Sequence, residues 1–219
     1  MKIEIAAFNY ESAIIADQNG ADRIEYCANW KDGGTTPDVE EVKTLLEKIN
    51  TPLTIMIRPR GGDFQYSEQE FNDMKESIEN FKDLPVLGFV FGILTSDQEI
   101  DSERNQELIK TAGDKICVMH RAFDKTPNMN LALDSVIECG FHTILTSGHA
   151  KNVEEGLENL KKLQDLSQNR IQIMPGGGLR SSNLNRIKSA VNCEFFHSSG
   201  IVDESGIANA DEIKRLKAH

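Results

Sequence analysis

The sequence predicts a (β/α)8 TIM barrel that residues 1–219 form as a single domain. Short apolar runs alternate with longer amphipathic runs along the whole chain, and no change of composition marks a linker. Strict alternation predicts parallel strands joined by right-handed crossovers. Eight such units can close into a barrel. An open, doubly wound sheet would show the same alternation and is the alternative architecture.

The expected strands are short and mostly apolar, and the expected helices fill the gaps between them. The strands are Lys2–Ala7, Arg23–Cys27, Leu53–Arg58, Val86–Phe91, Lys115–His120, His142–Thr146, Ile171–Met174 and Glu194–His197. The helices are residues 9–19, 37–49, 67–81, 101–112, 128–139, 152–166, 182–189 and 208–217. Ser67 and Glu70 have capping-box spacing. Thr36 and Thr126 each precede a proline and are expected to cap the second and fifth helices.

The composition excludes several classes of protein. A formal charge of -11 over 219 residues argues against a nucleic-acid-binding protein, which needs clustered Lys and Arg. The chain has no apolar run near the ~20 residues of a membrane span and no apolar signal core at its start. The four cysteines, Cys27, Cys117, Cys139 and Cys193, are widely spaced and contain no CxxC pair. We therefore expect reduced thiols, a cytoplasmic location and no membrane partner.

Charged and polar side chains occur where a barrel interior normally holds branched apolar residues. Those within or at the ends of strands are Glu4, Glu25, Arg58 and His120. Those at or just beyond strand C-termini are Arg60, Asp63, Arg121, Asp124, Ser147 and His197. A buried unpaired charge is costly, so these groups should pair or meet a ligand. One interpretation is a structural ion network of Glu4, Glu25 and Arg58. The other is an active site, because barrel enzymes place their chemistry at strand C-termini.

The segment Met56–Phe64 combines arginines with a flexible turn. Pro59 removes a backbone donor, so the strand should end near Arg58. The guanidinium groups of Arg58 and Arg60 are suited to recognise a carboxylate or a phosphate. The alternative for Arg60 is a loop ion pair with Asp63.

The segment that closes the fifth expected strand contains a histidine and an aspartate. His120 would titrate near neutral pH and could act as a general acid or base. Asp124 would orient either His120 or Arg121. The alternative is that His120 is a hydrogen-bonded structural residue, as most isolated strand-end histidines are.

Small residues follow the last two expected strands. They are Gly176, Gly177 and Gly178 after the seventh strand, and Ser198 and Ser199 after His197 in the eighth. Glycines before a helix N-terminus, expected here at Ser181 and Ser182, expose amide groups to an anion. Many barrels bind phosphate in these two loops. The sequence therefore predicts an anion site, although a triple glycine can also be only a tight turn.

The cysteines alone do not define a metal site. Cys27 follows Glu25 by two residues, so both should face the same side of their strand. Cu(I) prefers thiolate and thioether ligands, but no second cysteine is adjacent. Cys117 has the opposite parity to His120 and is expected to pack against the helices. Four unreactive thiols are the alternative, and no His/Cys cluster has the spacing of a structural zinc site.

The chain resembles the copper homeostasis protein CutC family along essentially its whole length. The matching stretches are Gly20–Cys27, Gly33–Pro37, Met56–Phe64, Phe91–Leu94, His120–Asp124, Ile144–Gly148 and Ile173–Gly178. The resemblance implies a cytoplasmic (β/α)8 barrel that self-associates as a homodimer or a higher homo-oligomer. It also implies a role in intracellular copper handling. Where some relatives carry cysteine, this chain has Ala6, Ala7 and Gln65, which leaves Cys27 as the best single copper ligand.

Two main hypotheses follow for the function. The first is copper homeostasis with Cu(I) bound through Cys27, copper being the one candidate cofactor. The alternative is an isomerase- or aldolase-like enzyme that acts on a small phosphorylated or carboxylated metabolite. Its expected catalytic residues are Glu25, Arg58, His120 and Asp124. Its expected anion- or substrate-binding residues are Glu4, Arg60, Asp63, Arg121, Ser147, Gly176, Gly177, Gly178, His197, Ser198 and Ser199. A non-catalytic scaffold ranks last, because a scaffold does not need charges inside a barrel.

Overall fold

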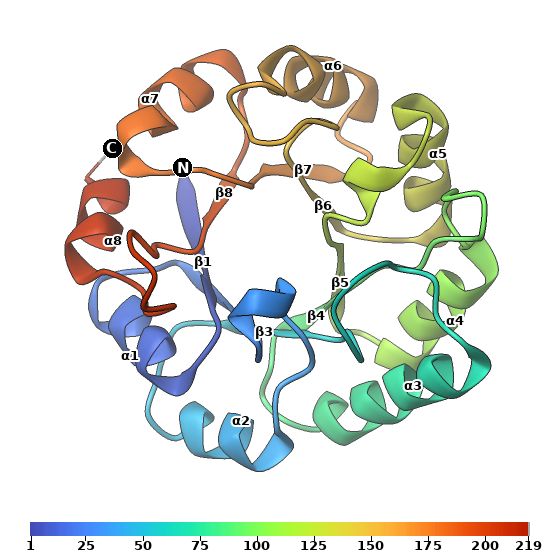
Figure 1. The fold of residues 1–219 in the computed structure, drawn as a ribbon, viewed down its shortest axis with the longest axis horizontal. Helices are drawn as coiled ribbons and strands as arrows, with labels where there is room; N and C mark the ends of the chain where they lie inside the picture. The colour runs from blue at the N-terminus through green and yellow to red at the C-terminus, as the bar shows by residue number, and fades with distance from the viewer. Residues whose placement is uncertain (219) are drawn as a thin grey trace.

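A computed structural model describes residues 1–218 as eight alternating strands and α-helices around a barrel (Figure 1). The strands are β1 Lys2–Ala7, β2 Arg23–Tyr26, β3 Leu53–Met56, β4 Gly88–Phe91, β5 Ile116–Met119, β6 Thr143–Thr146, β7 Gln172–Pro175 and β8 Phe195–Ser198. The helices are α1 Tyr10–Gln18, α2 Val39–Leu46, α3 Glu68–Lys82, α4 Ser102–Ala112, α5 Met129–Cys139, α6 Leu157–Ser167, α7 Ser181–Ala190 and α8 Ala210–Lys217. Two 3-10 helices, η1 Trp30–Asp32 and η2 Phe123–Lys125, lie in loops.

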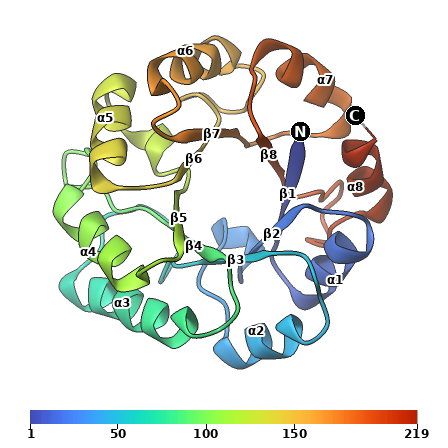
Figure 2. The ribbon, with the colours of Figure 1, turned by 180° about the vertical axis from the view of Figure 1, so that it is seen from behind.

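All the paired strands are parallel, and the sheet runs in the order β7-β6-β5-β4-β3-β2-β1-β8. A single parallel bridge between Gly176 and His197 joins the two ends of this sheet. The ribbon seen from behind shows the same ring of strands inside a ring of helices (Figure 2). The predicted barrel is confirmed, and the open doubly wound sheet is wrong, because the bridge between Gly176 and His197 links β7 to β8, the two ends of the strand order, and closes the sheet.

The alternation of strand side chains separates two apolar clusters. The larger cluster lies between the strands and the helices and includes Cys117, as its parity predicts. The smaller cluster fills the inside of the barrel. Its buried members are Cys27, Met56, Val90, Val118, Leu145 and Met174. The interior is therefore a packed core whose polar residues are the exception that needs an explanation.

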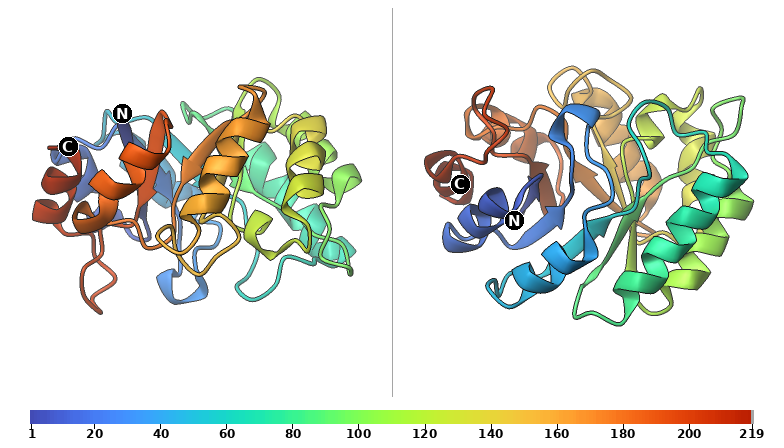
Figure 3. Two further views of the ribbon diagram at one scale, coloured as in Figure 1. Left: turned by 90° about the horizontal axis from the view of Figure 1, so that it is seen from above. Right: turned by 60° about the horizontal axis from the view of Figure 1, so that its bottom comes forward.

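The loops that follow the strands project from one side of the barrel. Figure 3 (left) shows the segments around η1, after β3 and between β8 and α8 on this side, while the N-terminus lies on the other. This is the C-terminal face of the barrel, and Figure 1 looks onto it. None of the helices in residues 1–218 combines the length and the apolar character that a membrane span requires.

The helix caps agree with the sequence at α3 and differ at α2 and α5. Ser67 caps α3 in a complete capping box with Glu70. The predicted threonine caps are wrong, because the Asp38 and Asn128 side chains accept the first amides of α2 and α5. In both cases the proline precedes the capping residue, and Asp and Asn are stronger caps than Thr.

Candidate functional site

A cavity of about 220 Å³ opens at the C-terminal ends of the strands. Nine residues predicted from the sequence line it: Glu25, Arg58, His120, Arg121, Gly177, Gly178, His197, Ser198 and Ser199. The other lining residues are Ala6, Phe8, Gly33, Met56, Phe64, Leu145 and Arg180. Seven predicted residues do not line it: Glu4, Cys27, Arg60, Asp63, Asp124, Ser147 and Gly176. The barrel thus brings most of the predicted site together, and the exceptions lie behind or beside the cavity.

A buried ion network lies behind the cavity around Glu4. Its fully buried carboxylate accepts a hydrogen bond from Arg23 Nε and lies 2.6 Å from His197 Nδ1. Burial alone would raise the pKa of Glu4, but Arg23 and His197 lower it below its usual value. Burial alone would lower the pKa of His197, but Glu25 and Glu4 raise it. The buried ion network therefore joins Glu4 to Arg23 and His197. The predicted network of Glu4, Glu25 and Arg58 is wrong, because Arg58 forms no ion pair within residues 1–218.

Glu25 presents an unsatisfied carboxylate oxygen. The Cys27 thiol donates to Glu25 Oε1 at 3.5 Å, and Glu25 Oε2 has no partner among the described residues. Burial raises the pKa of Glu25 to about 6. Burial and the neighbouring Glu25 raise the pKa of Cys27 well above its usual range, so the thiol holds its proton. A free, buried oxygen beside a buried thiol is costly unless a ligand or a proton completes the site.

His120 is buried as a neutral imidazole. Its Nδ1 accepts from the Ala122 amide at 3.3 Å, and its ring lies 4.8 Å from the Phe64 ring. Burial and then Arg58 lower the pKa of His120 to about 3. Because Nδ1 is an acceptor, Nε2 carries the proton, and this buried donor has no partner in residues 1–218. A Cβ at Gly92 would lie 2.9 Å from His120 Nδ1, so only glycine leaves room for the ring.

Arg58 joins the loop after β2 to the loop after β3. Its Nη1 donates to the carbonyls of Asp32 and Gly34 at 2.8 and 3.1 Å, and Nη2 donates to Gly62 at 2.9 Å. The guanidinium also lies over the Phe64 ring at 4.8 Å. Its Nε is buried without a partner among the described residues. Arg58 therefore fixes two loops of the mouth and keeps one donor free.

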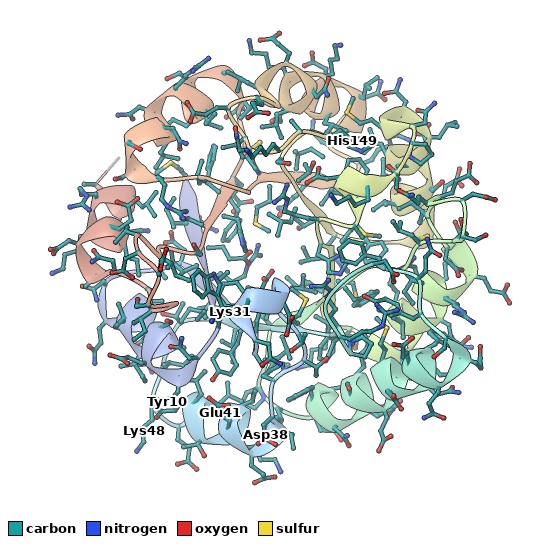
Figure 4. The ribbon with its side chains drawn as sticks, viewed as in Figure 1. Tyr10, Lys31, Asp38, Glu41, Lys48 and His149 are labelled. Atoms are coloured by element: carbon teal, nitrogen blue, oxygen red, sulfur yellow. The ribbon has the colours of Figure 1, made fainter. Side chains whose placement is uncertain are left out.

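Asp124 orients Arg121, and it makes no hydrogen bond with His120 in the described part of the chain. The carboxylate accepts from Arg121 Nε at 2.8 Å, from the Thr146 hydroxyl and from the Ser147 hydroxyl at 3.0 Å. It also accepts from the amide of His149, which Figure 4 labels on the loop after β6. Arg121 Nη2 donates to Ser147 Oγ at 2.7 Å. Asp124 and Ser147 thus hold the Arg121 guanidinium at the cavity wall.

Arg60 and Asp63 lie outside the cavity. They form an ion pair at 3.0 Å, and Arg60 Nε contacts Glu70 at 2.5 Å. The side chain of Arg60 is 39% exposed. The ion pair with Asp63 is the alternative that the sequence left open for Arg60. The contact with Glu70 connects the loop to the start of α3.

The N-terminus of α7 already holds an internal anion. Glu212 accepts from the Ser181 amide and hydroxyl, both at 2.7 Å. The helix begins at Ser181, within the expected start, and Arg180 occupies the capping position in place of a serine. The Ser198 hydroxyl donates to Leu179 O at 2.7 Å and accepts from Arg180 Nη1 at 3.3 Å. Arg180 also lines the cavity at this wall, and no motif in the sequence indicates it.

One group of side chains in residues 1–218 has the spacing of a metal site. The ligand atoms of Glu4, Glu25 and His197 all lie within 4.8 Å of one another, and all three residues are buried. Cys27 adjoins the group through its contact with Glu25. Carboxylate and imidazole suit a divalent ion, whereas Cu(I) would require the thiol. All four cysteines are free, as predicted.

The family comparison covers the barrel from β1 to β8 and leaves out α8. The model of the CutC family matches residues 1–202. A family protein CutC of Photorhabdus laumondii is 43% identical over 185 residues, covering 84% of this chain and 74% of that protein. The copper homeostasis protein cutC homolog of Homo sapiens is 39% identical over 197 residues, covering 90% and 72%.

Solved structures agree with this match. A crystal structure of CutC from Streptococcus agalactiae is 32% identical, covers 91% of this chain and 98% of that chain, and superposes with a TM-score of 0.85. N-(5'-phosphoribosyl)anthranilate isomerase from Pyrococcus furiosus, at 14% identity and a TM-score of 0.64, covers 99% and 96% and shares the fold alone. The family match, the identities and the superposition agree: this chain belongs to the CutC family.

Proposed function

We propose that this protein takes part in copper homeostasis in the cytoplasm and binds Cu(I) at the floor of the cavity through Cys27. Membership of a family with relatives named copper homeostasis proteins supports the role. The observation that carries the site is the contact between Cys27 Sγ and Glu25 Oε1 at 3.5 Å. No other cysteine of the chain adjoins the lining of the cavity.

The chemistry of this site couples copper binding to proton release. Cu(I) binds a thiolate, so the proton of Cys27 must leave when the metal arrives. Glu25 Oε1 already accepts that hydrogen, and its raised pKa of about 6 allows it to relay a proton. His197, within 4.8 Å of Glu25, supplies a nitrogen ligand. Met56 is buried in the same inner cluster as Cys27 and adds a thioether.

Competition with a chromogenic Cu(I) chelator under reducing conditions tests this proposal. We expect one tightly bound Cu(I) per chain, with an affinity that rises about tenfold for each pH unit below the pKa of the thiol. Cys27→Ser should abolish this binding. Cys193→Ser is the matched control, because Cys193 is a half-buried thiol far from the cavity lining. Unchanged copper binding in Cys27→Ser would remove Cys27 from the site.

A further inference from the structure

The two arginines of this chain that lack an ion pair line the same cavity. All nine arginines belong to the described residues. The paired ones are Arg23, Arg60, Arg104, Arg121, Arg170, Arg186 and Arg215. Arg58 and Arg180 have no carboxylate within ion-pair distance, and both line the mouth. In a protein of net charge -11, two unpaired guanidinium groups facing one cavity indicate a site for an anion.

Three residues of the cavity lining each carry a buried polar atom without a hydrogen bond. Within residues 1–218, the buried side-chain atoms without a hydrogen bond are Arg58 Nε, His120 Nε2, Glu25 Oε2 and Tyr66 Oη. The first three belong to residues of the cavity lining. Two of them are donors and one is an acceptor. Buried polar groups are normally satisfied, so a ligand with both acceptors and a hydroxyl donor would complete all three.

The wall of the cavity that follows β7 and β8, called the rim, has more hydrogen-bond donors than the two oxygen atoms of a carboxylate can satisfy. Arg121 lies against Gly177, where a Cβ would come within 2.9 Å of its guanidinium carbon. The amides of Gly177 and Gly178 donate no hydrogen bond within the described part of the chain. Arg180 and the Ser199 hydroxyl complete this wall of the cavity. A phosphate has three free oxygens for such a set, and a carboxylate has two.

We propose that the cavity binds the phosphate monoester of a small hydroxylated molecule. The phosphate lies at the rim between Arg121 and Arg180 and takes the amides of Gly177 and Gly178. The rest of the ligand reaches the floor, where a hydroxyl donates to Glu25 and oxygen atoms accept from His120 and Arg58. A volume of about 220 Å³ is below the range for drug-sized ligands and selects a small metabolite.

This phosphate site shares Glu25 with the proposed copper site, but the two proposals depend on different groups. Its donors stand on the rim and on His120 and Arg58, whereas the copper proposal depends on the Cys27 thiol. Phosphate binding should therefore persist in Cys27→Ser. That variant separates the two proposals, because each can fail without the other.

Thermal shift and calorimetry on the metal-free full chain test the proposal with three matched probes. They are glycerol 3-phosphate, glycerate and glycerol, which differ in the anionic group. We expect glycerol 3-phosphate to raise the melting temperature in a saturable way and to bind at least tenfold more tightly than glycerate. Glycerol should have no effect. Absence of saturable binding by glycerol 3-phosphate at millimolar concentration, or tighter binding of glycerate, would overturn the proposal.

Two variants locate the phosphate and the hydroxylated part separately. Arg180→Gln should weaken glycerol 3-phosphate and inorganic phosphate alike by at least tenfold. Arg186→Gln is its control, because Arg186 is 66% exposed on the next turn of α7. His120→Phe keeps an aromatic ring against Phe64 and should weaken glycerol 3-phosphate while leaving inorganic phosphate unchanged. If Arg180→Gln binds glycerol 3-phosphate and inorganic phosphate as tightly as the parent protein does, the phosphate group does not lie at the rim.

Discussion

Glu25 is the residue whose surroundings differ most from those of an ordinary carboxylate. It is 3% exposed, one oxygen faces the Cys27 thiol, and the other oxygen has no partner among the described residues. Burial raises its pKa to about 6. At neutral pH the folded protein therefore keeps a desolvated charge, which lowers its stability and prepares the site for a ligand.

The substitution Glu25→Gln should stabilise the folded protein at neutral pH. The pKa rises from 4.5 when unfolded to about 6 when folded, so the native state holds this proton more tightly. The free energy of unfolding of the parent therefore falls as the pH rises through this window. Relative to the parent, Glu25→Gln should gain about 2 kcal/mol between pH 4 and pH 7.5.

Urea denaturation across this pH range measures the effect. Glu76→Gln is the control, because it makes the same chemical change at an exposed position of α3. A constant difference between Glu25→Gln and the parent would show that Glu25 does not titrate in this window.

At the scale of elements, the loops after β2 and β3 depend on one guanidinium group. Arg58 donates to three carbonyls on these loops, and its amide donates to Thr36 Oγ1 at 2.9 Å. The 3-10 helix η1 lies in the first of these loops, and Figure 4 labels Lys31 on it, near the centre of the ring of strands. One planar group thus sets the shape of two sides of the cavity.

The substitution Arg58→Lys should loosen both loops while the barrel stays folded. An ammonium group cannot reproduce the planar fork that donates to both loops at once. We expect faster amide hydrogen exchange in residues 29–35 and 61–65, with unchanged exchange in the strands. Arg186→Lys, on the surface of α7, is the control. Exchange rates in both loops equal to those of the parent would show that other contacts hold them.

At the scale of the whole molecule, the barrel closes at its weakest seam between β7 and β8. Only the bridge between Gly176 and His197 joins them, whereas every other neighbouring pair of strands shares at least two registered residue pairs. A Cβ at Gly176 would lie 2.4 Å from Leu145 Cδ1 and 3.0 Å from His197 Cβ. The closure therefore requires glycine at this position for reasons of space.

The substitution Gly176→Ala should open this seam. The added methyl group overpacks the wall beside Leu145, which we expect to lower the free energy of unfolding by about 1–3 kcal/mol. Urea denaturation measures this loss. Gly176 does not have a positive φ, so its replacement adds steric overlap without backbone strain. A loss clearly below about 1 kcal/mol would show that the seam can relax. Self-association remains a prediction for the whole molecule and is tested by light scattering.

The sequence predicts the fold well because alternation and parity are local properties. The bounds of β1 agree at both ends, and Glu25, Arg58 and His120 line the cavity as their strands imply. The hydrogen-bond and ion-pair partners of these side chains depend on strand register and on loop conformation, which the alternation of side chains does not determine. The pairing of Glu4 with Arg23 follows from the register of β1 against β2.

Arg180 lies after a glycine turn, where no periodic pattern indicates its direction. Its place at the mouth follows from its bonds to Leu179 O and to Ile201 O at 2.7 and 2.9 Å. Asp124 likewise accepts from Arg121 because the loop after β6 holds its carboxylate through the amides of Ser147 and His149. These are contacts between loops, and neither composition nor spacing predicts them.

The ion network around Glu4 makes the cavity a pocket with a single opening. Arg23 lines a depression at the other end of the barrel, and its bond to Glu4 blocks passage between the two. A ligand must therefore leave by the route along which it arrived. An ion held on the floor beside Cys27 would exchange with solvent only while the rim is vacant. Arrival and departure would then follow a fixed order, with the ion first in and last out.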